Sequence, residues 1–354
     1  MKRIIFAYLT MLLLLAVLPV MAQENGETLT LVTYDSFAIS EEVQALFEEQ
    51  TGITLEILRL NDAGAMLNQA ILTKNNPLGD VLYGVDNTFL SRALNNDLFI
   101  PYESALLEFV PEDLRLGSEE FFATPVTIGD ICLNYDKAYF AENDLPLPES
   151  LADLTDPMYE GLLVVENPAS SSPGMAFLMA TIAEFGDDED SDYTYLDFWG
   201  ELVDNDVLVL DGWSEAYFGA FTAASEDGEY PLVVSYASSP PAEVLFAEEE
   251  LDESPTGAIV ADGMCFRQIE YVGILAGTEK VAAAQQLIDF MLGTDFQEDL
   301  PLQMFVFPVN EEAELPEIFI AHTAIPENPA ILDAATIDEN REEWIQEWTE
   351  TVLR

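Results

Sequence analysis

The chain has 354 residues, of which 67 are Asp or Glu and 11 are Lys or Arg, and its formal net charge at pH 7 is −56. This charge repels nucleic acids and anionic membrane surfaces and concentrates cations, although it equally suits solubility in salty or acidic surroundings. A hydrophobic content of 49 % argues against a disordered acidic tail, because such tails lack the apolar groups needed for a core. With one His and two Cys, no His- or Cys-based metal site and no cofactor are expected.

The first 22 residues are typical of an export signal. Lys2 and Arg3 precede an apolar stretch over residues 4–20, and residues 20–22 match a small-residue cleavage site. A permanent membrane anchor is the alternative, but the stretch is at the short end of the ~20 residues that a spanning helix needs. We therefore expect a cleaved signal peptide and an exported protein, periplasmic or extracellular.

Strand and helix patterns alternate from residue 28 onward. Residues 28–34 predict a strand, and Ser40 predicts the cap of a helix that Gly52 ends. Further strands are expected over residues 55–60, 80–85, 162–165, 207–210 and 231–236, and helices over 67–72, from about 173 and after Thr278. This alternation predicts a mainly parallel sheet in two α/β units, hence an α/β fold of two lobes with a cleft between them.

Polar and aromatic residues follow several of these strands. Ligands of open α/β sheets bind beyond the carboxyl ends of the strands. Tyr34 ends the first strand, Asp86 follows the strand over 80–85, and Tyr236 to Ser239 follow residues 232–235. The sequence therefore predicts a binding site at these strand ends.

Two loops add candidate contacts. Ser171 and Ser172 before Pro173 form either a plain helix cap or a grip on an oxygen-rich group. Trp213 is either a loop anchor or a platform for a stacked ligand, and aromatic faces favour a planar cation. Asp62 and Asp86 are suited to accept hydrogen bonds from an amino group.

Basic residues are missing from a long stretch. Between Lys137 and Arg267 there is no Lys or Arg. A lobe built from this stretch offers no ammonium or guanidinium group to hold a phosphate or carboxylate. Cations and neutral polar molecules are therefore the favoured ligands.

These features together resemble the periplasmic thiamine-binding proteins of bacterial ABC importers, a group within the extracellular solute-binding proteins. The matching positions, in chain order, are Tyr34 to Phe37, Asp62, Gly84 to Asn87, Ser171 to Gly174, Gly212 to Tyr217, Leu232 to Pro240, Phe307 to Val309, Arg341, Trp344 and Trp348. The resemblance implies a two-lobed type II periplasmic-binding fold. It also implies capture of thiamine or its phosphates and delivery to a permease and its ATPase.

Carried over by position, the resemblance implies ligand contacts throughout the predicted site. These are Tyr34, Asp62, Ala63, Ser171, Ser172, Trp213, Tyr236, Ala237, Ser238 and Ser239, with Asp86 and Phe305 as further candidates. Two positions depart from the family: Phe305 stands where better-known members have a Trp, and Ala242 where they have a Tyr. These changes are expected to loosen the stack or reshape the pocket for a relative of thiamine.

The resemblance also suggests how the chain divides. We expect lobe 1 over residues 27–128 and 264–310, lobe 2 over 129–263, and a C-terminal helical segment over 311–354 packing on lobe 2. An even number of cysteines in an exported chain favours a disulfide. Cys132 and Cys265 fall on stretches that could be neighbouring crossover strands, so a hinge disulfide is a hypothesis.

Two other functions stay open. Bacterial thiaminase I shares this general fold and uses a Cys nucleophile, which Cys132 or Cys265 could imitate only as a free thiolate of lowered pKa. A binding protein for another cationic solute, such as a polyamine or a thiamine precursor, is the second alternative. Iron(III) binders of this shape usually rely on adjacent tyrosines, and no Tyr-Tyr pair occurs. We expect a monomer without enzymatic activity.

Overall fold

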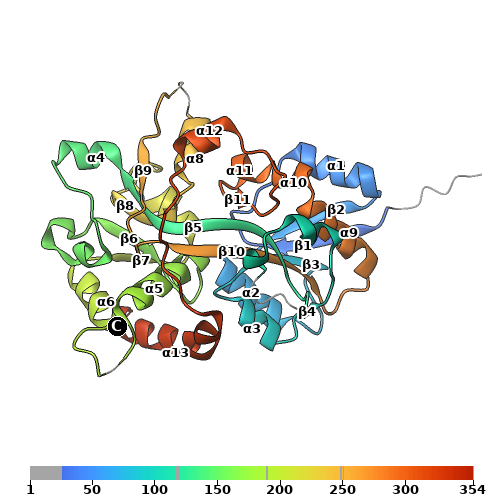
Figure 1. Cartoon of the computed structure of the whole chain (residues 1–354), viewed down its shortest axis with the longest axis horizontal. Helices are drawn as coiled ribbons and strands as arrows, with labels where there is room; N and C mark the ends of the chain where they lie inside the picture. The colour runs from blue at the N-terminus through green and yellow to red at the C-terminus, as the bar shows by residue number, and fades with distance from the viewer. Residues whose placement is uncertain (1–25, 116–119, 189, 248, 250, 354) are drawn as a thin grey trace, which may run out of the picture.

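The computed structural model describes residues 26–115, 120–188, 190–247, 249 and 251–353. The signal peptide expected at residues 1–22 lies outside them. The described chain forms two lobes, at the right and left of Figure 1, and two long strands run between them. No described helix is long and apolar enough to cross a membrane.

The right-hand lobe in Figure 1 is built on three parallel strands, because β1 pairs in parallel with both β2 and β3. Its main elements are β1 (Thr28–Thr33), α1 (Glu41–Thr51), β2 (Thr54–Arg59), α2 (Ala63–Leu72), β3 (Val81–Asp86), α3 (Leu90–Asn95), α9 (Val281–Leu292) and α10 (Thr294–Gln297).

The left-hand lobe repeats this arrangement. Here β6 pairs in parallel with β7 and β8. Its main elements are α4 (Lys137–Glu142), β6 (Leu163–Glu166), α5 (Ser172–Phe185), α6 (Tyr195–Asp204), β7 (Leu208–Leu210), α7 (Trp213–Glu215), β8 (Leu232–Tyr236), α8 (Pro240–Leu245) and β9 (Thr256–Ile259).

Two long antiparallel strands, β5 (Thr124–Asp136) and β10 (Phe266–Leu275), join the lobes. The strand order is β2-β1-β3-β10-β5-β8-β6-β7, with β10 antiparallel to β3 and β5 antiparallel to β8. The predicted parallel pairing is confirmed within each lobe and wrong at the centre. The chain leaves along β5 and returns along β10, so these neighbours must run in opposite directions.

The remaining elements, most of them short, complete the fold. They are β4 (Phe99–Ile100), β11 (Phe307–Pro308), α11 (Leu300–Gln303), α12 (Glu317–His322), α13 (Ala334–Val352), the 3₁₀ turns Ala105–Phe109, Glu112–Leu114, Leu151–Thr155 and Pro157–Tyr159, and a π-helical turn at Ala216–Ala220.

Local capping signals predicted one helix start correctly and misplaced another. Ser40 caps α1 and accepts a hydrogen bond from the Val43 amide at 3.2 Å, and Gly52 ends the helix with φ 72°. Thr278 was expected to cap α9, but the helix starts at Val281 with Lys280 as its cap residue. The Thr278 hydroxyl accepts from the Lys280 amide at 3.0 Å, just before the helix, and donates to Asp80 at 2.7 Å.

The C-terminal helix α13 packs its tryptophan face inward. Trp348 is fully buried and meets Trp199 of α6 edge-on, with ring centroids 5.4 Å apart. The same helix also reaches the other lobe, because Asn95 of α3 donates to Asp338 at 3.1 Å and the Arg341 guanidinium lies 4.2 Å from the centroid of the Phe89 ring. The C-terminal segment therefore packs on α6 of the left-hand lobe, and it also contacts α3 of the right-hand lobe.

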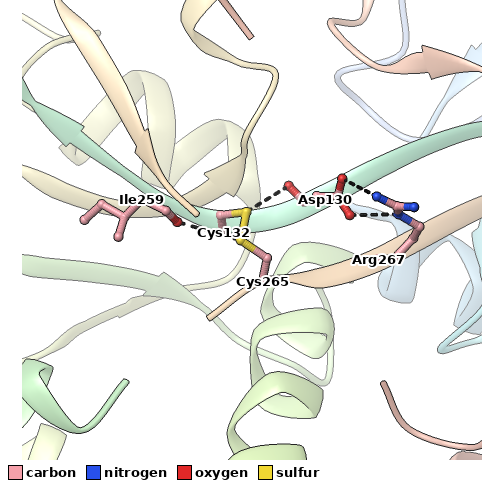
Figure 2. Close-up of a disulfide and its surroundings, with 5 residues drawn as sticks. All are labelled: Asp130, Cys132, Ile259, Cys265 and Arg267. Carbon is pink, nitrogen blue, oxygen red and sulfur yellow. Dashed lines mark hydrogen bonds and ion pairs between the residues drawn. A yellow bond between two sulfur atoms is a disulfide. The ribbon is translucent and has the colours of Figure 1, made fainter. Parts of the chain in front are cut away.

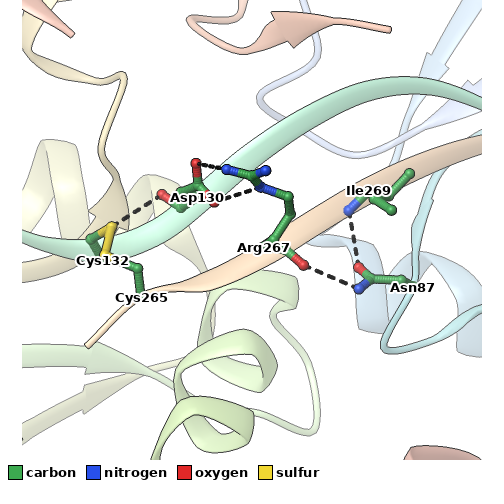
Figure 3. Close-up of polar contacts among 6 residues, drawn as sticks. All are labelled: Asn87, Asp130, Cys132, Cys265, Arg267 and Ile269. Carbon is green, nitrogen blue, oxygen red and sulfur yellow. Dashed lines mark hydrogen bonds and ion pairs between the residues drawn. A yellow bond between two sulfur atoms is a disulfide. The ribbon is translucent and has the colours of Figure 1, made fainter. Parts of the chain in front are cut away.

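A disulfide joins Cys132 of β5 to Cys265, the residue before β10 (Figure 2). Beside it, the Arg267 guanidinium makes two hydrogen bonds of 2.9 Å to the Asp130 carboxylate. Figure 3 shows that Asn87, which follows β3, donates to the Arg267 carbonyl and accepts from the Ile269 amide. These covalent, ionic and polar contacts hold the connection between the lobes in register.

Reduction of this disulfide should destabilise the protein without unfolding it. The two cysteines lie 133 positions apart, so the cross-link closes a long loop and restricts the unfolded chain strongly. We expect a reductant to lower the free energy of unfolding by about 2–4 kcal/mol, measured by urea denaturation. The double variant Cys132→Ala/Cys265→Ala should not respond to reductant; a response from it would attribute the effect to something other than this bond.

Candidate functional site

A cavity of about 240 Å³ lies where the two lobes meet. It is lined by rings, small hydroxyl residues and two carboxylates, with no Lys or Arg among the described lining residues. The lining is Tyr34, Ser36, Asp62, Ala63, Ser172, Pro173, Trp213, Ser214, Tyr217, Phe218, Tyr236, Ser239, Ala242, Phe246, Glu270, Gln303, Met304, Phe305 and Val306.

Trp213 is held rigidly at one wall of the cavity. Its ring stacks on Tyr217, with centroids 5.0 Å apart and an angle of 23° between the planes. The indole Nε1–H donates to the Ser235 hydroxyl at 2.9 Å. Because the ring is fixed on one side by Tyr217 and also lines the cavity, it is suited to stack a planar ligand.

Two glycines make room for two of the tyrosines that line the cavity. A Cβ added at Gly84, which has φ 101°, would lie 2.3 Å from the Tyr34 ring. A Cβ at Gly129 of β5 would lie 2.6 Å from the Tyr236 ring. Each phenol therefore lies against bare backbone, and the Tyr236 hydroxyl is fixed further by donating to Gln268 at 2.7 Å.

Asp62 caps α2 and ties the lobes together across the cavity. Its carboxylate accepts from the Ala63 amide at 2.6 Å, from the Trp213 amide at 2.8 Å and from the Ser172 amide at 3.4 Å. Burial raises the pKa of Asp62 to about 6, although these hydrogen bonds oppose the shift. The contacts with Trp213 and Ser172 join residues of the two lobes.

A second polar cluster, around Asp86, lies behind the wall of the cavity. Asp86 is fully buried and accepts from the Ser172 hydroxyl and from Gln268 Nε2, the latter at 2.6 Å. Burial raises the pKa of Asp86, against the hydrogen bonds that it accepts. The amide and hydroxyl of Ser172, expected to grip a ligand oxygen, are thus both engaged with carboxylates.

Eight of the twelve residues predicted from the sequence line the cavity: Tyr34, Asp62, Ala63, Ser172, Trp213, Tyr236, Ser239 and Phe305. The other four, Asp86, Ser171, Ala237 and Ser238, are buried behind it. Ala237 packs against the disulfide, and Ser238 donates to the Phe305 carbonyl at 2.6 Å. Neighbouring residues of a loop point in different directions, so a run of candidates cannot all face one cavity.

The sequence reasoning missed Glu270 and Phe246, and it included Tyr217 in the resemblance without selecting it as a ligand contact. Glu270 lies inside β10, where no turn or strand end marks it. Phe246 follows α8 one turn after Ala242 and packs edge-on against Phe305, with centroids 5.8 Å apart. The cavity therefore has a ring beside Ala242, where the sequence suggested one had been lost.

Buried carboxyls predict an unusual pH dependence of stability. Burial raises the pKa of Asp62, Asp86, Glu166, Glu243 and Glu270. The folded state then keeps protons that the unfolded state has lost, so stability is lost as pH rises through the folded pKa and regained on acidification.

We expect the free energy of unfolding of the ligand-free protein to increase from pH 7.5 to pH 5. Asp62 alone contributes roughly 1 kcal/mol, at about 1.4 kcal/mol per pH unit below its folded pKa. Urea denaturation at several pH values measures the change. A continuous decrease of the free energy over this range would contradict the assignment.

Comparisons with known proteins agree with this geometry. A family model described as "Bacterial extracellular solute-binding protein" matches residues 76–324. The "Thiamine-binding periplasmic protein" of Escherichia coli K12 is 29 % identical over 347 residues, covering 97 % of this chain and 98 % of that protein. The solved structure of a "Periplasmic thiamin binding protein" superposes with a TM-score of 0.80 at 27 % identity, covering 92 % of this chain and 96 % of that one.

More distant structures share the fold alone. A ferric binding protein from Campylobacter jejuni superposes with a TM-score of 0.72 at 18 % identity, covering 91 % of this chain and 99 % of that one. The two-lobed type II periplasmic-binding fold expected from the sequence is thus confirmed. The chain belongs to the family of bacterial extracellular solute-binding proteins.

Proposed function

We propose that this protein is the periplasmic solute-binding component of an ABC importer, and that it captures thiamine and delivers it to a membrane permease and its ATPase. The lining of the cavity carries the proposal. Rings from both lobes and the carboxylates of Asp62 and Glu270 surround it, and no described Lys or Arg lines it. Such a cavity favours a planar cation, and thiamine contains a positively charged thiazolium ring beside an aminopyrimidine. Relatives named for thiamine binding support the choice.

Closure of the lobes is part of the proposal. Lobe 1, over residues 27–128 and 264–310, would move against lobe 2, over 129–263, about the β5–β10 pair. A ligand shifts such an equilibrium only if it binds the closed state more tightly. Tyr34 on one side and Trp213 on the other would give thiamine contacts that exist together only after closure.

The alternatives fit the cavity less well. Cys132 and Cys265 are disulfide-bonded and fully buried, and neither lines the cavity, so a thiaminase-like nucleophile has no free thiolate among them. The described residues contain no group of three or more His, Cys, Asp or Glu side chains that could hold a metal ion. Another planar cation, such as a thiamine precursor, is an outcome of the test below.

A titration with thiamine, its monophosphate, its pyrophosphate and the isolated aminopyrimidine tests the proposal. We expect thiamine to bind at least as tightly as its pyrophosphate, because the lining offers the phosphates no cationic partner. Quenching of tryptophan fluorescence measures each affinity, and calorimetry controls for absorption by the ligands. Tighter binding of the pyrophosphate would contradict the charge argument, and no binding of thiamine would refute the proposed function.

A further inference from the structure

Glu270 is directed at the cavity by an irregularity in the central sheet. It lies on β10, opposite Asp86 on one side and Thr127 of β5 on the other. The pairing with β5 shifts register between Glu270 and Tyr271, and the pairing with β3 shifts one residue later. Such bulges re-aim side chains next to binding sites. Glu270 is only 3 % exposed, yet its side chain lines the cavity.

The Glu270 carboxylate has no cationic partner in the described part of the chain. Its hydrogen bonds come from hydroxyl groups: Tyr83 donates to Oε2 at 2.8 Å and Thr127 donates to the same oxygen at 2.6 Å. The described ion pairs all lie elsewhere, on Asp80, Asp130 and Glu342. Asp86 nearby adds a like charge and raises the pKa of Glu270 further after burial has raised it. A buried carboxylate in such surroundings is stabilised by a cation that enters beside it.

The other buried carboxylates are less suited to this role. Asp62 already accepts hydrogen bonds from three backbone amides, which offset its charge. Asp86 and Glu166 are fully buried and do not line the cavity. Glu270, by contrast, lines the cavity, and the groups that donate hydrogen bonds to it are neutral hydroxyls. Glu270 helps to raise the pKa of the adjacent Tyr34 hydroxyl. The Tyr34 ring offers an aromatic face beside the same carboxylate.

We propose that Glu270 is the counter-ion by which the cavity selects a positively charged heteroaromatic ring over a neutral ring of the same shape. The inference rests on the proposed function and assigns to Glu270 the recognition of the thiazolium charge, with Tyr34 stacking beside it. Without ligand the unpaired carboxylate costs stability; with ligand it gains a partner. Replacing Glu270 by Gln, which keeps the shape and an acceptor oxygen, should therefore act in opposite directions on the free and the bound protein.

The test compares Glu270→Gln with Glu49→Gln, a control that removes one charge from the exposed face of α1. Both variants and the unchanged protein are titrated by calorimetry with thiamine and with its neutral analogue, in which a thiophene replaces the thiazolium ring. We expect Glu270→Gln to weaken thiamine binding at least tenfold, or about 1.4 kcal/mol, and to change binding of the neutral analogue less than about twofold. Glu49→Gln should leave both affinities unchanged. Urea denaturation should find the ligand-free Glu270→Gln protein at least as stable as the unchanged one.

Binding of the neutral analogue shows that the variant is folded. The inference is overturned if Glu270→Gln weakens both ligands equally, if it weakens neither, or if the unchanged protein binds the neutral analogue as tightly as thiamine. A loss of stability in the ligand-free variant would also overturn it, because a purely structural carboxylate predicts that loss. If the unchanged protein binds neither ligand, the proposed function is wrong, and so is the inference that rests on it.

Discussion

Trp213→Ala is expected to weaken thiamine binding at least tenfold, which corresponds to about 1.4 kcal/mol or more. The substitution removes the ring that lines one wall of the cavity and is braced by Tyr217 at a centroid distance of 5.0 Å. It also removes the donor to the Ser235 hydroxyl and leaves the Tyr236 ring without its edge-on neighbour. The stack would therefore lose both area and rigidity. Calorimetric titration with thiamine measures the effect.

Trp213→Phe separates the ring face from the hydrogen bond. Phe keeps an aromatic surface but cannot donate to Ser235, so its affinity should fall between those of the unchanged protein and Trp213→Ala. The Asp62 contact uses the backbone amide of residue 213 and is retained in both variants. An unchanged affinity in Trp213→Ala would refute the role of this residue as a stacking platform.

Gly84→Ala should reduce both affinity and stability. The added methyl group would lie 2.3 Å from the Tyr34 ring, and the backbone at φ 101° is strained for any residue with a Cβ. We expect the ring to be displaced from the cavity wall, with a loss of thiamine affinity of about tenfold or more. Backbone strain should reduce the free energy of unfolding by about 1–3 kcal/mol. Calorimetry and urea denaturation measure the two effects.

Gly52→Ala is the matched control for this variant. Gly52 also has a positive φ, 72°, but a Cβ there would meet nothing within 4 Å. The Gly52→Ala variant should lose about 1–2 kcal/mol of its free energy of unfolding through backbone strain alone. It should bind thiamine with unchanged affinity. If Gly84→Ala also bound thiamine normally, the contact between Gly84 and Tyr34 would not matter for the site.

The rule that ligands bind beyond the carboxyl ends of strands placed two tyrosines correctly and failed for two carboxylates. It placed Tyr34 and Tyr236 correctly, because Tyr34 directly follows β1 and Tyr236 ends β8, and both strands could be recognised from their own residues. It selected Asp86 as well, but that side chain turns back to bond the amides of Thr88 and Phe89 and the hydroxyl of Ser172. Glu270 was missed because it faces the cavity only once β10 lies between β3 and β5.

Several features of this protein are determined by residues that are close together in the sequence or by composition. The α1 caps at Ser40 and Gly52 depend on hydrogen bonds and backbone angles within one turn, and the lack of Lys and Arg between residues 137 and 267 is a property of composition. The tertiary structure alone decided the antiparallel centre of the sheet, the carboxylates that face the cavity and the partners of Ser172. These depend on strand register and on contacts between residues far apart in the sequence, such as Asp86 and Ser172, 86 positions apart, and Asp62 and Trp213, 151 positions apart. No local pattern encodes such contacts.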